Sequence, residues 1–140
     1  MKRRTAARAE AEPVGCGEGM TQSVNRRERT GAVLVVEDDP LVRASGIDMF
    51  ADLGLRVYGA YSGAQALHLL REKPHIRLVF TDVRMPGMDG ASLAREIARL
   101  HPDVKVVLTS GYVGSEQVAG LPFVPKPWNA EAIAALATEV

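Results

Sequence analysis

Acidic residues follow two separate apolar segments of the chain. Glu37 and Asp38 come directly after the apolar run of residues 33–36, and Asp82 follows the run of residues 78–81. Carboxylates gathered in one place repel one another and raise a pKa unless a cation neutralises them, and Mg²⁺ is a cation that takes hard oxygen ligands. These residue types therefore predict a magnesium site with Glu37, Asp38 and Asp82 as ligands.

Two further polar residues fit phosphoryl transfer to a carboxylate. A carboxylate nucleophile such as Asp82 forms an acyl phosphate, and the oxygens of the transferred group need their charge neutralised. The Lys126 ammonium supplies positive charge beside Mg²⁺, and the Ser110 hydroxyl can donate a hydrogen bond to a phosphoryl oxygen. Each residue type thus meets one requirement of this reaction.

Each of these residues also has a structural explanation when it is taken alone. Acidic residues are favoured at helix N-termini, so Glu37, Asp38 and Asp39 fit the start of a helix. Asp82 fits a turn, and a lysine such as Lys126 is most often a surface residue. Their joint position at the ends of separate strands is what favours a phosphoryl-transfer site.

The elements that must position these groups alternate along the chain. Short apolar runs predict strands at residues 32–36, 56–60, 78–81, 104–109 and 122–124, and amphipathic stretches predict helices at residues 40–53, 63–71, 90–100 and 130–139. Ser62 and Asn129 are the predicted N-caps of the second and last helices. Residues 115–119 leave room for barely more than one helical turn, so we expect a short or distorted fourth helix there.

Continuous apolar strands alternating with helices are typical of a parallel sheet that is covered on both faces. In such a sheet, functional groups gather beyond the carboxyl ends of the strands. The strand order 2-1-3-4-5, which right-handed crossovers permit, brings the acidic residues, Ser110 and Lys126 into one crevice. The predicted fold class is therefore α/β, a flavodoxin-like doubly wound sheet of five parallel strands.

Composition limits the alternatives. The 140 residues, 46% hydrophobic and 24% charged, predict one globular domain, and the balance of 17 basic and 17 acidic residues gives no argument for nucleic-acid or membrane binding. Residues 1–30 carry a net charge of +3 and few apolar residues, so they are predicted to be a flexible basic tail ahead of a domain at residues 31–140. The single cysteine, Cys16, cannot form an internal disulfide, which fits the cytoplasm.

Four motifs in order make residues 31–138 resemble the response-regulator receiver domain of two-component signalling. They are residues 33–40 (VLVVEDDP), 79–90 (VFTDVRMPGMDG), 106–112 (VVLTSGY) and 123–127 (FVPKP). The resemblance implies that Asp82 is the phosphoacceptor and that Lys126 pairs with the phosphoryl group. It also implies that Glu37 and Asp38 bind Mg²⁺ together with Asp82 and the backbone carbonyl of Arg84.

The resemblance further implies two switch residues, the hydroxyl residue Ser110 and the aromatic residue Phe123. Of the adjacent hydroxyls of Thr109 and Ser110, Ser110 is the better match because a small residue follows it. The bond between Lys126 and Pro127 is expected to be cis, as is usual in the family. The interval from Ser110 to Lys126 is shorter than usual, which resembles stand-alone receivers and receivers fused to hybrid histidine kinases.

The function that follows is to accept a phosphoryl group from a histidine kinase or a phosphotransfer protein, without enzymatic activity beyond the domain's own phosphorylation and dephosphorylation. Because the chain ends within its last predicted helix, we expect output through protein contact or onward phosphotransfer, with no direct nucleic-acid or membrane binding. A homodimer is left open.

Two alternatives come from other functional classes. A Mg²⁺-dependent aspartyl phosphatase of the haloacid-dehalogenase type has an Asp-x-Asp after its first strand and a cap over its substrate, whereas this chain has Glu37-Asp38-Asp39 and no cap insertion. A pseudo-receiver uses the fold as a docking surface without phosphorylation. Multiple turnover of a phosphomonoester favours the first alternative, and a complex insensitive to Asp82→Asn favours the second.

Overall fold

Strands and helices alternate along the chain in the computed structural model, which describes residues 31–111 and 120–140. The elements are β1 (Ala32–Val36), α3 (Pro40–Ala51), β2 (Arg56–Ala60), α4 (Gly63–Glu72), β3 (Ile76–Asp82), α5 (Gly90–Leu100), β4 (Lys105–Ser110), β5 (Phe123–Pro125) and α6 (Ala130–Ala137). All strand pairs are parallel, and the order is β2-β1-β3-β4-β5. The predicted flavodoxin-like topology is therefore confirmed.

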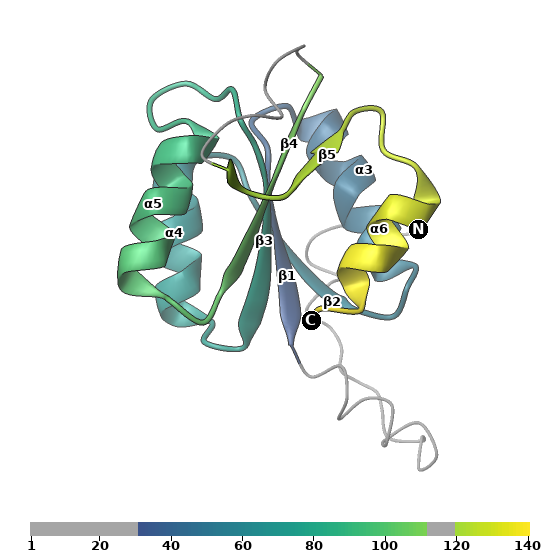
Figure 1. Cartoon of the computed structure of the whole chain (residues 1–140), viewed down its shortest axis with the longest axis horizontal. Helices are drawn as coiled ribbons and strands as arrows, with labels where there is room; N and C mark the ends of the chain where they lie inside the picture. The colour runs from purple at the N-terminus through teal and green to yellow at the C-terminus, as the bar shows by residue number, and fades with distance from the viewer. Residues whose placement is uncertain (1–30, 112–119) are drawn as a thin grey trace.

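The sheet separates two hydrophobic cores. Figure 1 shows α4 and α5 on one face of the sheet and α3 and α6 on the other. Alternate residues of β1 enter the two cores, Leu34 and Val36 on the α4–α5 side and Val33 and Val35 on the α3–α6 side. Because β1 is buried on both faces, every one of its residues is apolar.

Side-chain caps set the starts of the helices. Ser62 accepts a hydrogen bond from the Gln65 backbone N–H, and Asn129 accepts one from the Ala132 backbone N–H, as predicted. Asp89, which the sequence reading did not single out, caps α5. These caps satisfy N–H groups that have no partner within the helix, so each helix begins at the residue after its cap.

The ends of several elements differ from the prediction by one or two residues. The first helix ends at Ala51 because the N–H groups of Leu53 and Gly54 bond to the carbonyls of Phe50 and Ala51, and Gly54 has a φ of 88°. β3 extends from residue 76 to residue 82, so Asp82 is the last residue of the strand. The predicted tail at residues 1–30 and the predicted fourth helix at residues 115–119 lie outside the described residues.

None of the helices formed by residues 31–111 and 120–140 is long and apolar enough to cross a membrane.

Candidate functional site

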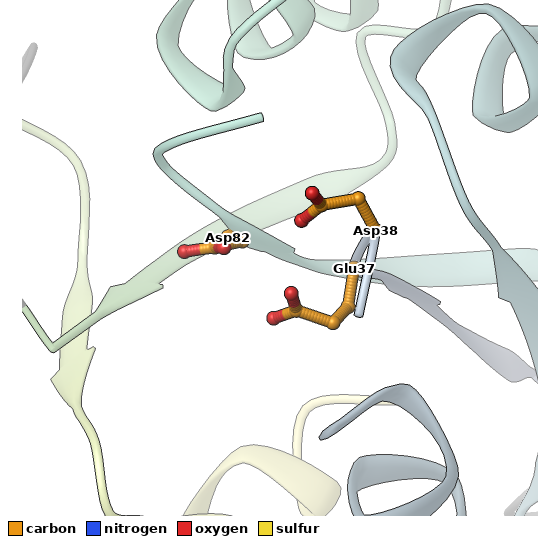
Figure 2. Close-up of side chains that lie close together, drawn as sticks. All are labelled: Glu37, Asp38 and Asp82. Carbon is orange, nitrogen blue, oxygen red and sulfur yellow. The ribbon is translucent and has the colours of Figure 1, made fainter. Parts of the chain in front are cut away.

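Three carboxylates meet at the carboxyl edge of the sheet. β1 and β3 pair with Val36 opposite Thr81, so Glu37 lies beside Asp82. One carboxylate oxygen from each of Glu37, Asp38 and Asp82 can be chosen so that all three lie within 4.8 Å of one another. Figure 2 shows the three side chains bordering one space. The structure thus brings together the three residues that the sequence predicts as metal ligands.

Lys126 faces two of these carboxylates. Its Nζ lies 2.9 Å from Oε1 of Glu37 and 3.6 Å from Oδ2 of Asp82. The backbone places it there, because β5 pairs with β4 and the Lys126 N–H donates to the Ser110 carbonyl. The pairings of β1 with β3, of β3 with β4 and of β4 with β5 therefore bring Lys126 close to Glu37 and Asp82, although the lysine is far from both in the sequence. The Lys126–Pro127 bond is cis, as predicted.

Burial makes the ionised forms of Glu37 and Asp82 less favourable than they are in water. Glu37 is 3% exposed and Asp82 is 7% exposed. Burial raises the pKa of Glu37 more than its hydrogen bonds from Lys126 and from the Asp39 backbone lower it, and the charge of Asp82 raises it further. Burial therefore disfavours the ionised form of Glu37 even with the Lys126 ammonium beside it.

Burial also prevails for Asp82, whereas for Lys126 the neighbouring carboxylates prevail. Burial raises the pKa of Asp82 against the opposing effect of Lys126 and of the backbone N–H groups of Val83 and Arg84. Burial of Lys126 acts against its charge, but the hydrogen bond to Glu37 and the charges of both carboxylates outweigh it and raise the lysine pKa. Lys126 is therefore held in its charged form beside the acidic cluster.

The loop after β1 is fixed by contacts to its backbone and side chains. Nη1 of Arg43 donates a hydrogen bond to the Glu37 carbonyl oxygen, with 2.8 Å between nitrogen and oxygen. The Asp39 N–H donates to Oε2 of Glu37 at 3.2 Å. Asp39 itself caps α3, accepting hydrogen bonds from the N–H groups of Leu41 and Val42. Of the three consecutive acidic residues, only Asp39 is therefore the N-cap.

The other predicted site residues are Ser110, Arg84 and Phe123, and the structure relates each of them to the acidic centre in a different way. Ser110, 2% exposed, ends β4 next to the strand of Asp82. The Arg84 backbone N–H bonds to the Asp82 carboxylate, whereas the use of the Arg84 carbonyl as a metal ligand stays a prediction. Phe123 begins β5 and packs against the α4–α5 core, so its part in switching also stays a prediction.

Gly90 is a positioning residue that the sequence reading overlooked. A Cβ atom at Gly90 would lie 2.3 Å from the backbone carbonyl oxygen of Asp82, and the Gly90 N–H donates to the Val83 carbonyl at 2.8 Å. The start of α5 therefore lies directly against the backbone of the phosphoacceptor candidate. The only sequence signal is a glycine at the end of the motif that contains Asp82.

Comparisons with known proteins agree with this geometry. The family model of the response regulator receiver domain matches residues 33–137. The sensor kinase CckA of Brucella abortus is 34% identical in an alignment of 140 positions, which covers 95% of this chain and 15% of CckA. The response regulator GacA of Pseudomonas protegens is 49% identical in an alignment of 78 positions, which covers 54% of this chain and 36% of GacA. The chain thus spans well under half the length of either relative.

Solved structures give the same result. The crystal structure of the receiver domain of NtrX from Brucella abortus superposes with a TM-score of 0.68 at 31% sequence identity. The similarity covers 75% of this chain and 93% of the NtrX chain.

Proposed function

The chain belongs to the response-regulator receiver domain family of two-component signalling, and we propose that it accepts a phosphoryl group on Asp82. The observation that supports this most directly is the grouping of Glu37, Asp38 and Asp82, with their oxygens within 4.8 Å, next to the Lys126 ammonium. A nucleophile, a cation site and a fixed positive charge are the parts that phosphoryl transfer to a carboxylate requires.

The donor set fits Mg²⁺. Carboxylate oxygens are the hard ligands that Mg²⁺ prefers, and burial together with repulsion from a neighbouring carboxylate raises the pKa of Glu37 and of Asp82 even with the Lys126 ammonium beside them. Glu37, Asp38 and Asp82, with the carbonyl of Arg84, would hold the ion. When bound, Mg²⁺ neutralises negative charge on the oxygens of the transferred group.

The chain's own residues account for the remaining steps. A carboxylate oxygen of Asp82 forms a bond to phosphorus while the bond from phosphorus to the donor histidine nitrogen breaks, and the leaving imidazole keeps that electron pair. The backbone N–H of Arg84 orients the Asp82 carboxylate, while the N–H of Val83 donates to the Thr109 carbonyl and holds this end of β3 against β4. Lys126, already 3.6 Å from Asp82, pairs with a phosphoryl oxygen, and the Ser110 hydroxyl donates to another.

The donor that we propose is a histidine kinase or a histidine phosphotransfer protein. Two relatives support this class of partner, since one is named a sensor kinase and the other a response regulator. We also propose that the output is a protein contact or onward phosphotransfer and that the protein is cytoplasmic. The basic tail at residues 1–30 is part of the same proposal.

Intact-protein mass spectrometry tests the proposal. After incubation with acetyl phosphate and Mg²⁺, the wild-type mass is expected to increase by one phosphoryl group, and omission of Mg²⁺ is expected to suppress the increase. Asp82→Asn should stay unmodified, whereas Asp48→Asn, which changes an exposed carboxylate of α3, should behave as wild type. A wild-type protein that is unmodified under saturating donor and Mg²⁺ would overturn the assignment.

A further inference from the structure

Trp128, the single tryptophan of the chain, lies half-buried two residues after Lys126. Its indole Nε1–H donates to Oγ1 of Thr109 at 2.7 Å. Its ring is tilted against Phe80 of β3, with 5.3 Å between ring centroids and 57° between ring planes. One side chain in the segment of the lysine therefore contacts two of the strands that end at the site, β3 and β4.

The opposite edge of the indole lies against α3. A Cβ atom at Gly46 would lie 3.2 Å from Cζ3 and 3.3 Å from Cη2 of Trp128. These distances are tighter than most real contacts of a Cβ atom, so a glycine at this position lets the ring approach the helix closely. With the helix at one edge, Phe80 against the ring and Thr109 on its N–H, the indole has little freedom to rotate.

This fixed ring lies close to the ammonium that faces the carboxylates. Lys126 Nζ is 5.9 Å from the centroid of the Trp128 ring, within the range of a cation–π contact. A lysine side chain has many rotamers, and holding its ammonium between two acceptors requires neighbours that limit them. Trp128 is one such neighbour of the ammonium, and Glu37, whose Oε1 lies 2.9 Å from it, is another.

The partner of the indole is also close to the phosphoacceptor candidate. Thr109 pairs in register with Asp82, and its carbonyl accepts the Val83 N–H at 3.0 Å. The hydrogen bond between Trp128 and Thr109 therefore ties the lysine segment to the strand position beside Asp82. Movement of either segment would change the distance between the ammonium and the carboxylate.

We propose that Trp128 is a positioning residue that acts through Lys126. Its hydrogen bond to Thr109 and its packing on Gly46 and Phe80 hold the segment from which the Lys126 ammonium reaches Glu37 and Asp82. The inference rests on the proposed function, because phosphorylation of Asp82 is the reaction that the lysine serves.

Thr109→Val is the variant that tests the proposal. It removes the acceptor of the indole N–H at nearly constant size and leaves Gly46 and Phe80, against which the ring packs, unchanged. Its matched control is Thr138→Val, which changes an exposed threonine whose hydroxyl donates to the Ala135 carbonyl at the end of α6. With acetyl phosphate and Mg²⁺, Thr109→Val is expected to lower the limiting phosphorylation rate about fivefold, the effect of one lost hydrogen bond, while Thr138→Val leaves it unchanged.

A double-mutant cycle separates positioning from a general structural effect. If Trp128 acts through the lysine, Thr109→Val should have no further effect on the rate once Lys126→Ala is present. The same fivefold loss in both backgrounds would overturn the proposal, as would a wild-type rate for Thr109→Val alone. Trp128→Phe, which removes the donor instead of the acceptor, is expected to repeat this pattern if Thr109→Val proves unstable.

The single indole N–H resonance in the ¹H–¹⁵N spectrum tests the contacts without any phosphorylation. Thr109→Val and Lys126→Ala should both shift this resonance, and Thr138→Val should not. A wild-type protein that is never phosphorylated overturns the proposed function, whereas an indole resonance that ignores Lys126→Ala overturns the positioning role. The two failures are therefore distinguishable.

Discussion

Replacing Asp82 with asparagine is expected to stabilise the metal-free protein at neutral pH. The side chain of Asp82 is 9% exposed, and burial together with the charge of Asp38 raises its pKa despite Lys126 at 3.6 Å and two backbone N–H donors. A raised pKa means that the ionised form is less stable in the folded chain than in the unfolded chain. Asparagine keeps the size and one acceptor oxygen but removes the charge.

The sign and size of the effect follow from linkage. Because the folded pKa lies above the unfolded one, this carboxyl contributes stability that is fully present below its ordinary pKa of 3.8 and is lost as the pH rises through the folded pKa. Each unit between the two pKa values corresponds to about 1.4 kcal/mol. We therefore expect Asp82→Asn to raise the free energy of unfolding by about 1 kcal/mol at pH 7 and to lose this advantage in acid.

Mg²⁺ is expected to reverse the advantage. A ligand that binds only the folded state at ten times its Kd stabilises that state by about 1.4 kcal/mol, and the wild-type site has one more carboxylate to hold the ion than the variant has. Urea denaturation at pH 7, with EDTA or with MgCl₂, measures both effects. Asp48→Asn, on the exposed side of α3, is the control and should change stability by less than about 0.5 kcal/mol.

One result would refute this reasoning. If Asp82→Asn is less stable than wild type in EDTA while Asp48→Asn is unchanged, the ionised Asp82 carboxylate stabilises the fold. The acidic cluster would then be a structural feature satisfied by Lys126 alone, and its crowding would give no argument for a cation.

The stabilities of two further variants, Lys126→Met and Gly90→Ala, test which contacts hold the site together. Lys126→Met is expected to lower the free energy of unfolding in EDTA by about 3 kcal/mol, because Glu37 stays buried without its partner at 2.9 Å, and Mg²⁺ should recover part of this loss in urea denaturation. Gly90→Ala is expected to destabilise by about 2 kcal/mol and to slow phosphorylation, because the new Cβ meets the Asp82 backbone at 2.3 Å. Gly63→Ala, whose new Cβ comes closest to the Met88 side chain and not to backbone, is its control, and equal losses of stability for the two would contradict the steric argument.

The topology and the acidic centre were predictable because both follow from repeated local patterns. Strands that are buried on both faces are apolar throughout, as β1 is, and a carboxylate that follows such a run must lie at the strand's carboxyl end. Once β1 and β3 are neighbours, Glu37 and Asp82 must meet. The helix ends were less predictable, because hydrogen bonds such as that of the Gly54 N–H to the Ala51 carbonyl set them.

The positioning residues could not be predicted in the same way. A polar residue after an apolar strand is conspicuous, whereas Trp128 is one more large apolar side chain and Thr109 one more strand residue. Their hydrogen bond depends on the register of β4 with β5 and on the path of the chain after Lys126, neither of which has a local sequence signal. Gly46 likewise matters only because an indole from another segment lies against it.

This difference has a physical origin. Groups that react must stay polar and must reach solvent or a partner, so their residue types are restricted and visible. Groups that hold them act through shape, and many apolar residues give similar shapes until the packing is known. Packing against the core therefore does not separate Trp128 from Phe50, whose ring also lies against Phe80. The contact with Lys126 and the hydrogen bond to Thr109 distinguish Trp128, which is why coupling to Lys126, rather than loss of stability, decides whether Trp128 serves the reaction.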